Sequence, residues 1–220
     1  MNQYLVAVLW AVVGAGAGWV VRWGSVKLAV LEGLEPGHKP WQVFGPPVAA
    51  AIVFAAFAIA ITSFPLLFVR SIFGLVLVQV IFFDFEHRLI LDRLMFPSMA
   101  LAALVSLSPL VAPGLGLWRQ PWWAGIAMGV VAGAIFLILS LAGAALFKAE
   151  ALGFGDVKLA AFMGLLLGWP YTFTAIFYGV VLAGVVSLGV IVWRRSMKGT
   201  IAYGPYLAIG ALIMLLYPLE

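Results

Sequence analysis

Cysteine is absent from this chain of 220 residues, and charged residues are scarce. Asp, Glu, Lys and Arg make up only 9% of it, whereas an average soluble domain has about 25%. Without cysteine there can be no disulfide and no thiolate metal site. The two histidines alone argue against a structural zinc site. We therefore expect no metal and no cofactor.

Apolar residues are what the chain has instead. They account for 65% of the sequence, which also contains 24 glycines and 9 tryptophans. A water-soluble domain of this length would not have such a composition. We expect an all-α fold, a polytopic membrane helix bundle that forms a single membrane domain over residues 1–220.

The apolar runs predict about eight transmembrane helices. A span needs about 20 mostly apolar residues. The candidates are 4–21, 47–63, 66–83, 94–112, 123–147, 157–168, 171–193 and 201–218. The sixth is short, which suits a helix that begins inside a polar indentation.

The basic residues predict the orientation. An even number of spans puts both termini on one side. With the termini outside, ten of the 12 basic residues fall in cytoplasmic loops or in the first turn of the sixth span, as the positive-inside rule requires. Of the other two, Arg70 is expected to snorkel from the outer end of its span. This arrangement predicts a multi-pass protein of the cytoplasmic (inner) membrane with a short cytoplasmic loop over 22–46.

The net charge of +4 does not indicate a nucleic-acid partner, because the positive-inside rule already accounts for the basic loops. The partner that the composition indicates is the lipid bilayer. Glycines recur at four-residue spacing, which lets helix backbones approach closely. They are Gly14 and Gly18; Gly125, Gly129 and Gly133; Gly164 and Gly168. Such stripes serve bundle packing and dimerisation alike, so they leave the oligomeric state open.

Two short polar segments, 84–92 and 150–158, contain five of the eight acidic residues. Each borders a long apolar run, where an unpaired carboxylate costs about 2.5–3.5 kcal/mol. In the predicted topology both segments face the cytoplasm. Acidic residues in such positions are candidates for function.

Asp84 and Asp156 are the candidate catalytic pair. Two carboxylates within about 3 Å of each other do not both ionise easily, so the pair holds one proton near neutral pH. The ionised member can activate a water and the protonated member can donate to a carbonyl oxygen. Gly153 and Gly155 remove side chains beside Asp156 and so allow a close approach.

Structural interpretations stand beside the catalytic one. Asp156 could simply cap the sixth span, and Asp92 could be the N-cap of the fourth. Glu86, with His87 and Arg88, is expected to form a solvated loop and not a catalytic triad. The chain contains no Gly-x-Ser-x-Gly elbow for a serine nucleophile.

At these residues the sequence resembles the type IV prepilin peptidases, which are membrane aspartyl proteases of the Gly-x-Gly-Asp class. The first family motif, an Asp followed by Ile-Pro-Asp, reads Asp84 and then Ile90-Leu91-Asp92 here. The second reads Glu150-Ala-Leu-Gly153-Phe-Gly155-Asp156-Val-Lys158. A late Gly-Pro-aromatic element is present at 204–206, and the likeness covers a peptidase-like core from about residue 47 to 220.

The resemblance implies an intramembrane aspartic endopeptidase with Asp84 and Asp156 as the catalytic residues. Its substrate would be a prepilin-like protein whose short basic leader is removed at the cytoplasmic face. Asp92, Glu150 and Lys158 match motif positions and are expected in supporting roles. Glu86, with Asp92 and Glu150, would attract the basic leader.

Many family members carry a domain with paired Cys-x-x-Cys motifs between the first two spans, associated with N-methylation of the new pilin N-terminus. That region has no cysteine here, so we expect no methyltransferase activity. The alternative to the peptidase is a non-enzymatic membrane transporter or pilus-assembly protein that uses the same carboxylates. Transporters commonly show internal repeats, and none is evident in this sequence.

Overall fold

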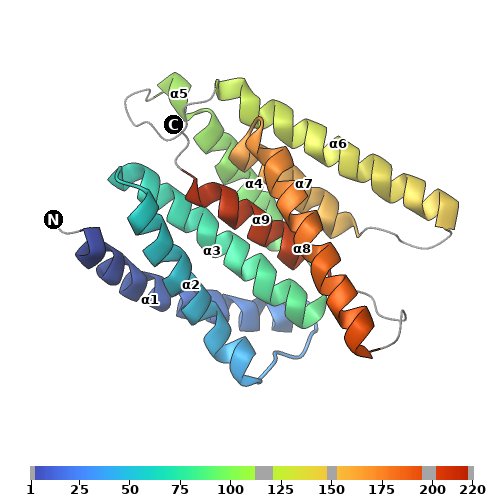
Figure 1. The fold of residues 1–220 in the computed structure, drawn as a ribbon, viewed down its shortest axis with the longest axis horizontal. Coiled ribbons are helices and arrows are strands. Elements are labelled where there is room, and N and C mark those ends of the chain that lie inside the picture. The colour runs from blue at the N-terminus through green and yellow to red at the C-terminus, as the bar shows by residue number, and fades with distance from the viewer. Residues whose placement is uncertain (1–2, 112–120, 148–152, 195–201, 218–220) are drawn as a thin grey trace.

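The computed structural model describes residues 3–111, 121–147, 153–194 and 202–217, and this part of the chain is helical with no strand (Figure 1). The helices are α1 (Gln3–Leu31), α2 (Pro40–Ala60), α3 (Phe64–His87), α4 (Asp92–Ser106), α5 (Ser108–Val111), α6 (Trp122–Phe147), α7 (Phe154–Leu167), α8 (Tyr171–Arg194) and α9 (Gly204–Leu216). Each of the eight predicted spans overlaps one long or short helix, and the fourth also includes the single turn α5. The predicted all-α membrane helix bundle is confirmed.

Six segments of the described chain are long and apolar enough to cross a membrane: α1, α2, α3, α4 together with α5, α6, and α8. The other two helices are shorter. α7 has 14 residues and α9 has 13. The chain is therefore a multi-pass membrane protein in which two short apolar helices accompany the long ones.

The ends of several helices follow directly from the sequence. Pro40, Pro65 and Pro205 lie in the first turns of α2, α3 and α9, where a missing N–H costs no hydrogen bond. Gly168, the C-cap of α7, has a φ of 64° and donates its N–H to the Gly164 carbonyl oxygen at 3.0 Å. Gly168 is thus a helix terminator and not a continuation of the predicted packing stripe.

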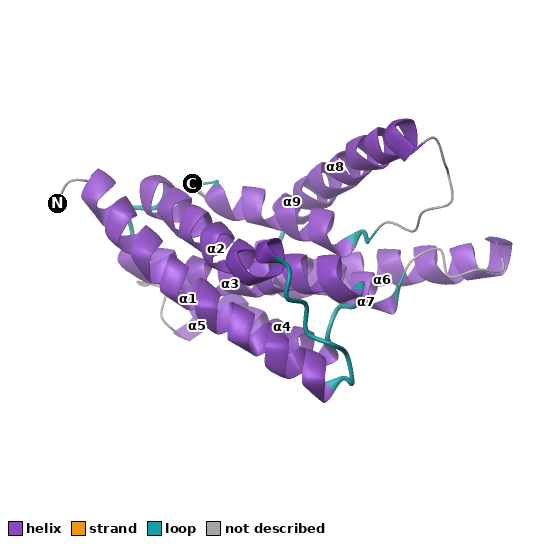
Figure 2. Cartoon of the chain, turned by 90° about the horizontal axis from the view of Figure 1, so that it is seen from below, coloured by secondary structure: helices purple, strands orange, loops and turns teal. Residues whose placement is uncertain are grey.

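Three helices, α3, α7 and α9, form the centre of the bundle. α9 contacts both of the others, while α1 packs along α2 and α6 packs along α7. Phe73, Phe162 and Leu215, one from each central helix, are completely buried. α8 packs mainly on α9 and diverges from the remaining helices (Figures 1 and 2). The hydrophobic core is therefore centred on α3 and the two short helices α7 and α9.

Glycines allow the closest helix contacts, as predicted. A Cβ on Gly14 of α1 would lie 2.6 Å from the Ala50 carbonyl oxygen of α2. A Cβ on Gly129 of α6 would lie 2.7 Å from the Cγ of Leu165 on α7. These positions have no room for any side chain, so the glycine spacing sets how closely the helices pack.

The expected cytoplasmic loop over 22–46 is wrong in its extent. α1 continues to Leu31 and α2 begins at Pro40, so the connection is only 32–39. The helix continues past Arg22 because this side chain is buried and lies 3.4 Å from the Glu86 carboxylate. Lys27 covers the Trp23 ring at 3.9 Å. Charges that appeared to mark a loop therefore lie on the helix, one paired with a carboxylate and one against an aromatic ring.

Arg70 does not snorkel, contrary to the sequence-based expectation. Its side chain is fully buried, and one guanidinium nitrogen donates to the carbonyl oxygens of Leu215 and Tyr217 at 2.7 and 2.8 Å. Carbonyls at a helix C-terminus lack intrahelical partners and carry partial negative charge. Arg70 therefore stays inside because the end of α9 supplies its acceptors.

The α6–α7 contact gives a stability prediction. A Cβ on Gly164 would collide with the Met128 carbonyl oxygen of α6, which cannot rotate away. Gly164→Ala should therefore lower the free energy of unfolding by about 1–3 kcal/mol. Gly184→Ala on α8 is the matched control, because nothing lies within 4 Å of its added Cβ. Thermal unfolding in detergent checks both variants, and equal midpoints would contradict this packing.

Candidate active site

Asp84 lies in the last turn of α3 and is only 5% exposed. Arg88, four residues further on, has a φ of 53° and donates its N–H to the Asp84 carbonyl oxygen at 2.9 Å. This left-handed residue ends the helix and turns the chain sharply toward α4. The Arg88 cation also interacts with the Asp84 carboxylate. The end of α3 thus fixes a carboxylate at the edge of an apolar core.

Asp156 lies in the first turn of α7, where Gly153 is the N-cap. The backbone N–H of Gly153 donates to the Asp156 carboxylate. A side chain at the third helical position that accepts from the N-cap amide is half of a capping box. Asp156 is therefore not the N-cap itself, but the N-cap amide of Gly153 orients its carboxylate.

The pKa of Asp156 is raised from its usual value to about 6, mainly because burial disfavours the charged form. The hydrogen bond from Gly153 partly offsets this by stabilising the carboxylate. Asp156 lies outside the six segments long enough to cross a membrane. A carboxyl group with this pKa can take up or release a proton near neutral pH.

Ile90 brings the two carboxylates into one site. This residue of the α3–α4 connection is buried, and a Cβ on Gly155 would lie 2.9 Å from its own Cβ. The glycine before Asp156 is therefore required for α7 to approach the segment that follows α3. Asp84 and Asp156 lie close enough to repel each other electrostatically. The structure therefore brings the two predicted catalytic residues within electrostatic range of each other.

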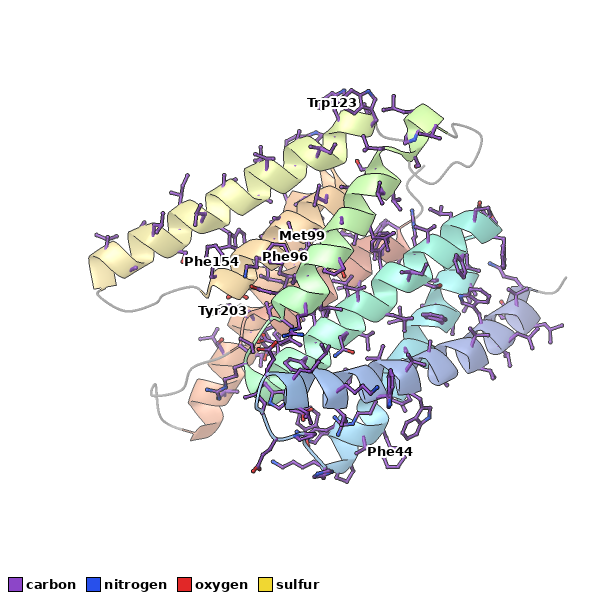
Figure 3. All side chains as sticks on the ribbon, turned by 180° about the vertical axis from the view of Figure 1, so that it is seen from behind. Phe44, Phe96, Met99, Trp123, Phe154 and Tyr203 are labelled. Atoms are coloured by element: carbon purple, nitrogen blue, oxygen red, sulfur yellow. The ribbon has the colours of Figure 1, made fainter. Side chains whose placement is uncertain are left out.

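Lys158 and Asp92 form an ion pair that joins the first turns of α7 and α4. The Lys158 ammonium also lies 5.4 Å from the centre of the Phe96 ring and 4.9 Å from that of Phe154. Figure 3 shows these two rings close together on one side of the bundle. Asp92 is the first residue of α4, whose N-cap is Leu91, so Asp92 is not the N-cap. It contributes a link between two helices.

Glu86 does not lie on an open, solvated loop. Its side chain is buried, and its carboxylate accepts from Arg22 of α1 at 3.4 Å and from the backbone N–H of Gly37. His87 lies 3.3 Å from the same carboxylate. Arg22 in turn donates to the Gly37 carbonyl oxygen. Glu86 therefore ties α1 and the 32–39 connection to the end of α3 that carries Asp84.

Glu150 lies outside the described residues. Among the described ones, no group of three His, Asp or Glu side chains could hold a metal ion. Sequence reasoning missed Arg22, Gly37 and Ile90 as parts of this region. The signal for Arg22 was its position as a lone cation inside an apolar run, where a charge needs a partner.

Known proteins are similar to this chain over the same region. The type IV leader peptidase family matches residues 71–188, which is more than half of the chain and includes both aspartates. The chain therefore belongs to this family. No solved structure matches it.

Curated relatives carry the name prepilin leader peptidase/N-methyltransferase. The chain is 29% identical over 188 residues to the Bacillus subtilis protein, covering 82% of this chain and 68% of that one. It is 31% identical over 140 residues to the Pseudomonas aeruginosa protein, covering 61% and 44%. For the Stutzerimonas stutzeri protein the figures are 26% over 135 residues, 61% and 44%. The chain thus matches less than half the length of the last two.

The Glu86 contacts predict a measurable change in the 32–39 connection. Glu86→Ala removes the acceptor of the Gly37 N–H, so amide exchange in this segment should become about 10- to 100-fold faster, the effect of losing a hydrogen bond to a charged group. Hydrogen–deuterium exchange with mass spectrometry measures it. Glu35→Ala, an exposed acid in the same segment, is the control. Unchanged protection in the Glu86 variant would mean that the connection is held by other contacts.

Proposed function

We propose that this chain is an intramembrane aspartic endopeptidase that removes the leader of type IV prepilin-like proteins at the cytoplasmic face of the inner membrane. The observation that carries the proposal is the convergence of Asp84 and Asp156, from two helix ends, in a region that matches the leader peptidase family. Membership in a peptidase family favours this reading over a transporter.

In the proposed mechanism, the pair holds one proton between its two carboxyl groups. The ionised member takes a proton from a water, which attacks the carbonyl carbon of the scissile peptide bond. The protonated member donates to the carbonyl oxygen, and the proton taken from water then goes to the leaving amine. Burial of the carboxyl groups near an apolar core supports this sharing of one proton near neutral pH.

The supporting residues have structural roles in this proposal. Glu86 is engaged with Arg22 and Gly37, and Asp92 with Lys158. Both carboxylates therefore already have partners within the protein. We assign them the role of holding the helix ends in place and not that of attracting a basic leader. The 32–39 connection and the absence of cysteine support a peptidase without methyltransferase activity.

The aspartates give the direct test. Asp84→Asn and Asp156→Asn keep the side-chain size but remove the ionisable group, so each should lower cleavage of a co-expressed prepilin by about 10²- to 10⁴-fold. A gel-shift assay on membranes measures cleavage, and immunoblotting confirms that the variants are inserted. Glu35→Gln, an exposed acid of the 32–39 connection, should cleave like the wild type.

Wild-type cleavage by either Asn variant would disprove the paired-aspartate mechanism. The intact mass of the product gives a second result from the same sample. It should correspond to an unmethylated N-terminus, and an added methyl group would show that methyl transfer does not need the cysteine-containing domain.

The raised pKa of Asp156 predicts an unusual pH dependence. Because this pKa is about 6, Asp156 is mostly ionised at pH 7 and mostly protonated at pH 5, whereas an ordinary Asp is ionised at both. Once both carboxyl groups are protonated no base remains, so the rate should fall about tenfold per pH unit below about pH 6. Initial rates between pH 4.5 and 8 measure this limb. A rate that stays constant down to pH 4.5, with the protein still folded, would contradict the assignment.

A further inference from the structure

α9 reaches the catalytic pair, although it lies outside the family match over 71–188. We propose that α9 is the third element of the catalytic site, in which Gly204 positions the Asp84 carboxylate and Arg70 fixes the opposite end of the helix. The inference rests on the proposed function, since it assigns α9 a role at the same pair of aspartates.

Gly204 is the first residue of α9 and touches Asp84 directly. Its backbone N–H donates to the Asp84 carboxylate. A Cβ at this position would lie 2.5 Å from Asp84 Oδ2, a separation that real Cβ contacts do not show. Only glycine lets the first free amide of the helix approach the carboxylate this closely.

Ile90 connects Gly204 to the second aspartate. A Cβ on Gly204 would lie 3.0 Å from Ile90 Cδ1, and one on Gly155 would lie 2.9 Å from Ile90 Cβ. One isoleucine side chain therefore packs against two glycines, each next to a different member of the pair. Its volume, together with the two missing side chains, sets how far apart Asp84 and Asp156 lie.

α3 holds α9 at both ends with charges of opposite sign. Asp84 faces the N-terminus of α9, and Arg70 donates to the carbonyls of Leu215 and Tyr217 at its C-terminus. Each charge complements the helix dipole at its end. Asp84 lies roughly 21 Å beyond Arg70 along α3, and 13-residue α9 is about 20 Å long. The separation of Arg70 and Asp84 along α3 matches the length of α9, so both contacts form at once.

This arrangement makes α9 a rigid positioning element and not simply a packing helix. Asp84 also interacts electrostatically with the carboxylate of Asp156 and the cation of Arg88. The orientation of its carboxylate therefore decides which of these two interactions is stronger. The Gly204 amide is a fixed donor that favours one orientation of the carboxylate and stabilises its charged form. Moving the donor should therefore alter both the rate and its pH dependence.

Gly204→Ala tests the proposal. The added Cβ should push the Asp84 carboxylate off the amide and lower kcat about 10- to 100-fold, the loss expected for one hydrogen bond to a charged group. KM should change little, because Gly204 acts through the Asp84 carboxylate. The acid limb of the rate, which reports Asp156, should move to lower pH, because an Asp84 without its amide donor is charged less of the time and so repels the Asp156 carboxylate less.

Gly210→Ala is the matched control on the same helix. Its Cβ would collide with the Ala175 carbonyl oxygen of α8, away from the aspartates. It should lower thermal stability but leave the acid limb where the wild type has it. Arg70→Lys is a second test at the far end of α9. It keeps the charge but loses the guanidinium that reaches two carbonyls, so kcat should fall and the acid limb should shift in the same direction as in Gly204→Ala.

A folded Gly204→Ala or Arg70→Lys variant with wild-type kcat and a wild-type acid limb would overturn the proposal. So would a Gly210→Ala variant that shifts the limb as far as Gly204→Ala does, because packing alone would then explain the effect. Asp84→Asn separates this result from the proposed function. If Asp84→Asn is inactive while Gly204→Ala is normal, only the role of α9 fails; if Asp84→Asn cleaves normally, the aspartic mechanism itself fails.

Discussion

The arrangement of the helices depends on how two carboxylates, Asp84 and Asp156, are stabilised beside an apolar core. Each receives a backbone amide from the start of a short helix, Asp156 from Gly153 of its own helix and Asp84 from Gly204 of α9. Free amides at helix N-termini favour negative charge. The three central helices therefore meet at the aspartates because α3 ends where α7 and α9 begin.

The surrounding contacts hold these three helix ends together. Ile90 fills the space between the two glycines that adjoin the aspartates. Lys158 and Asp92 link α7 to α4, while Glu86 links α3 to α1 and to the 32–39 connection. Most charged side chains near the site are thus paired within the protein, which a membrane environment requires. The proposed function uses the ionisation of the two remaining acids, Asp84 and Asp156.

The sequence predicted the eight main helices and the approach of Asp84 to Asp156, because apolar length and acids that border apolar runs are local signals. It misplaced the first connection, since Arg22 seemed to end a span, whereas its partner Glu86 lies 64 positions away. It also gave no role to Gly204, because the reason for a glycine there is Asp84, and their contact depends on how α9 packs against α3. Pairing partners and close approaches are long-range properties that composition and spacing do not encode.

The approach of Asp84 to Asp156 is the central claim, and a chain without cysteine allows it to be measured directly. The double variant Asp84→Cys/Asp156→Cys should be linked in membranes by a short bifunctional thiol reagent, as should Asp92→Cys/Lys158→Cys, whose parent residues are in contact. Linkage of both pairs is the expected result. Efficient linkage of the second pair with none of the first would show that the two aspartates do not share a site.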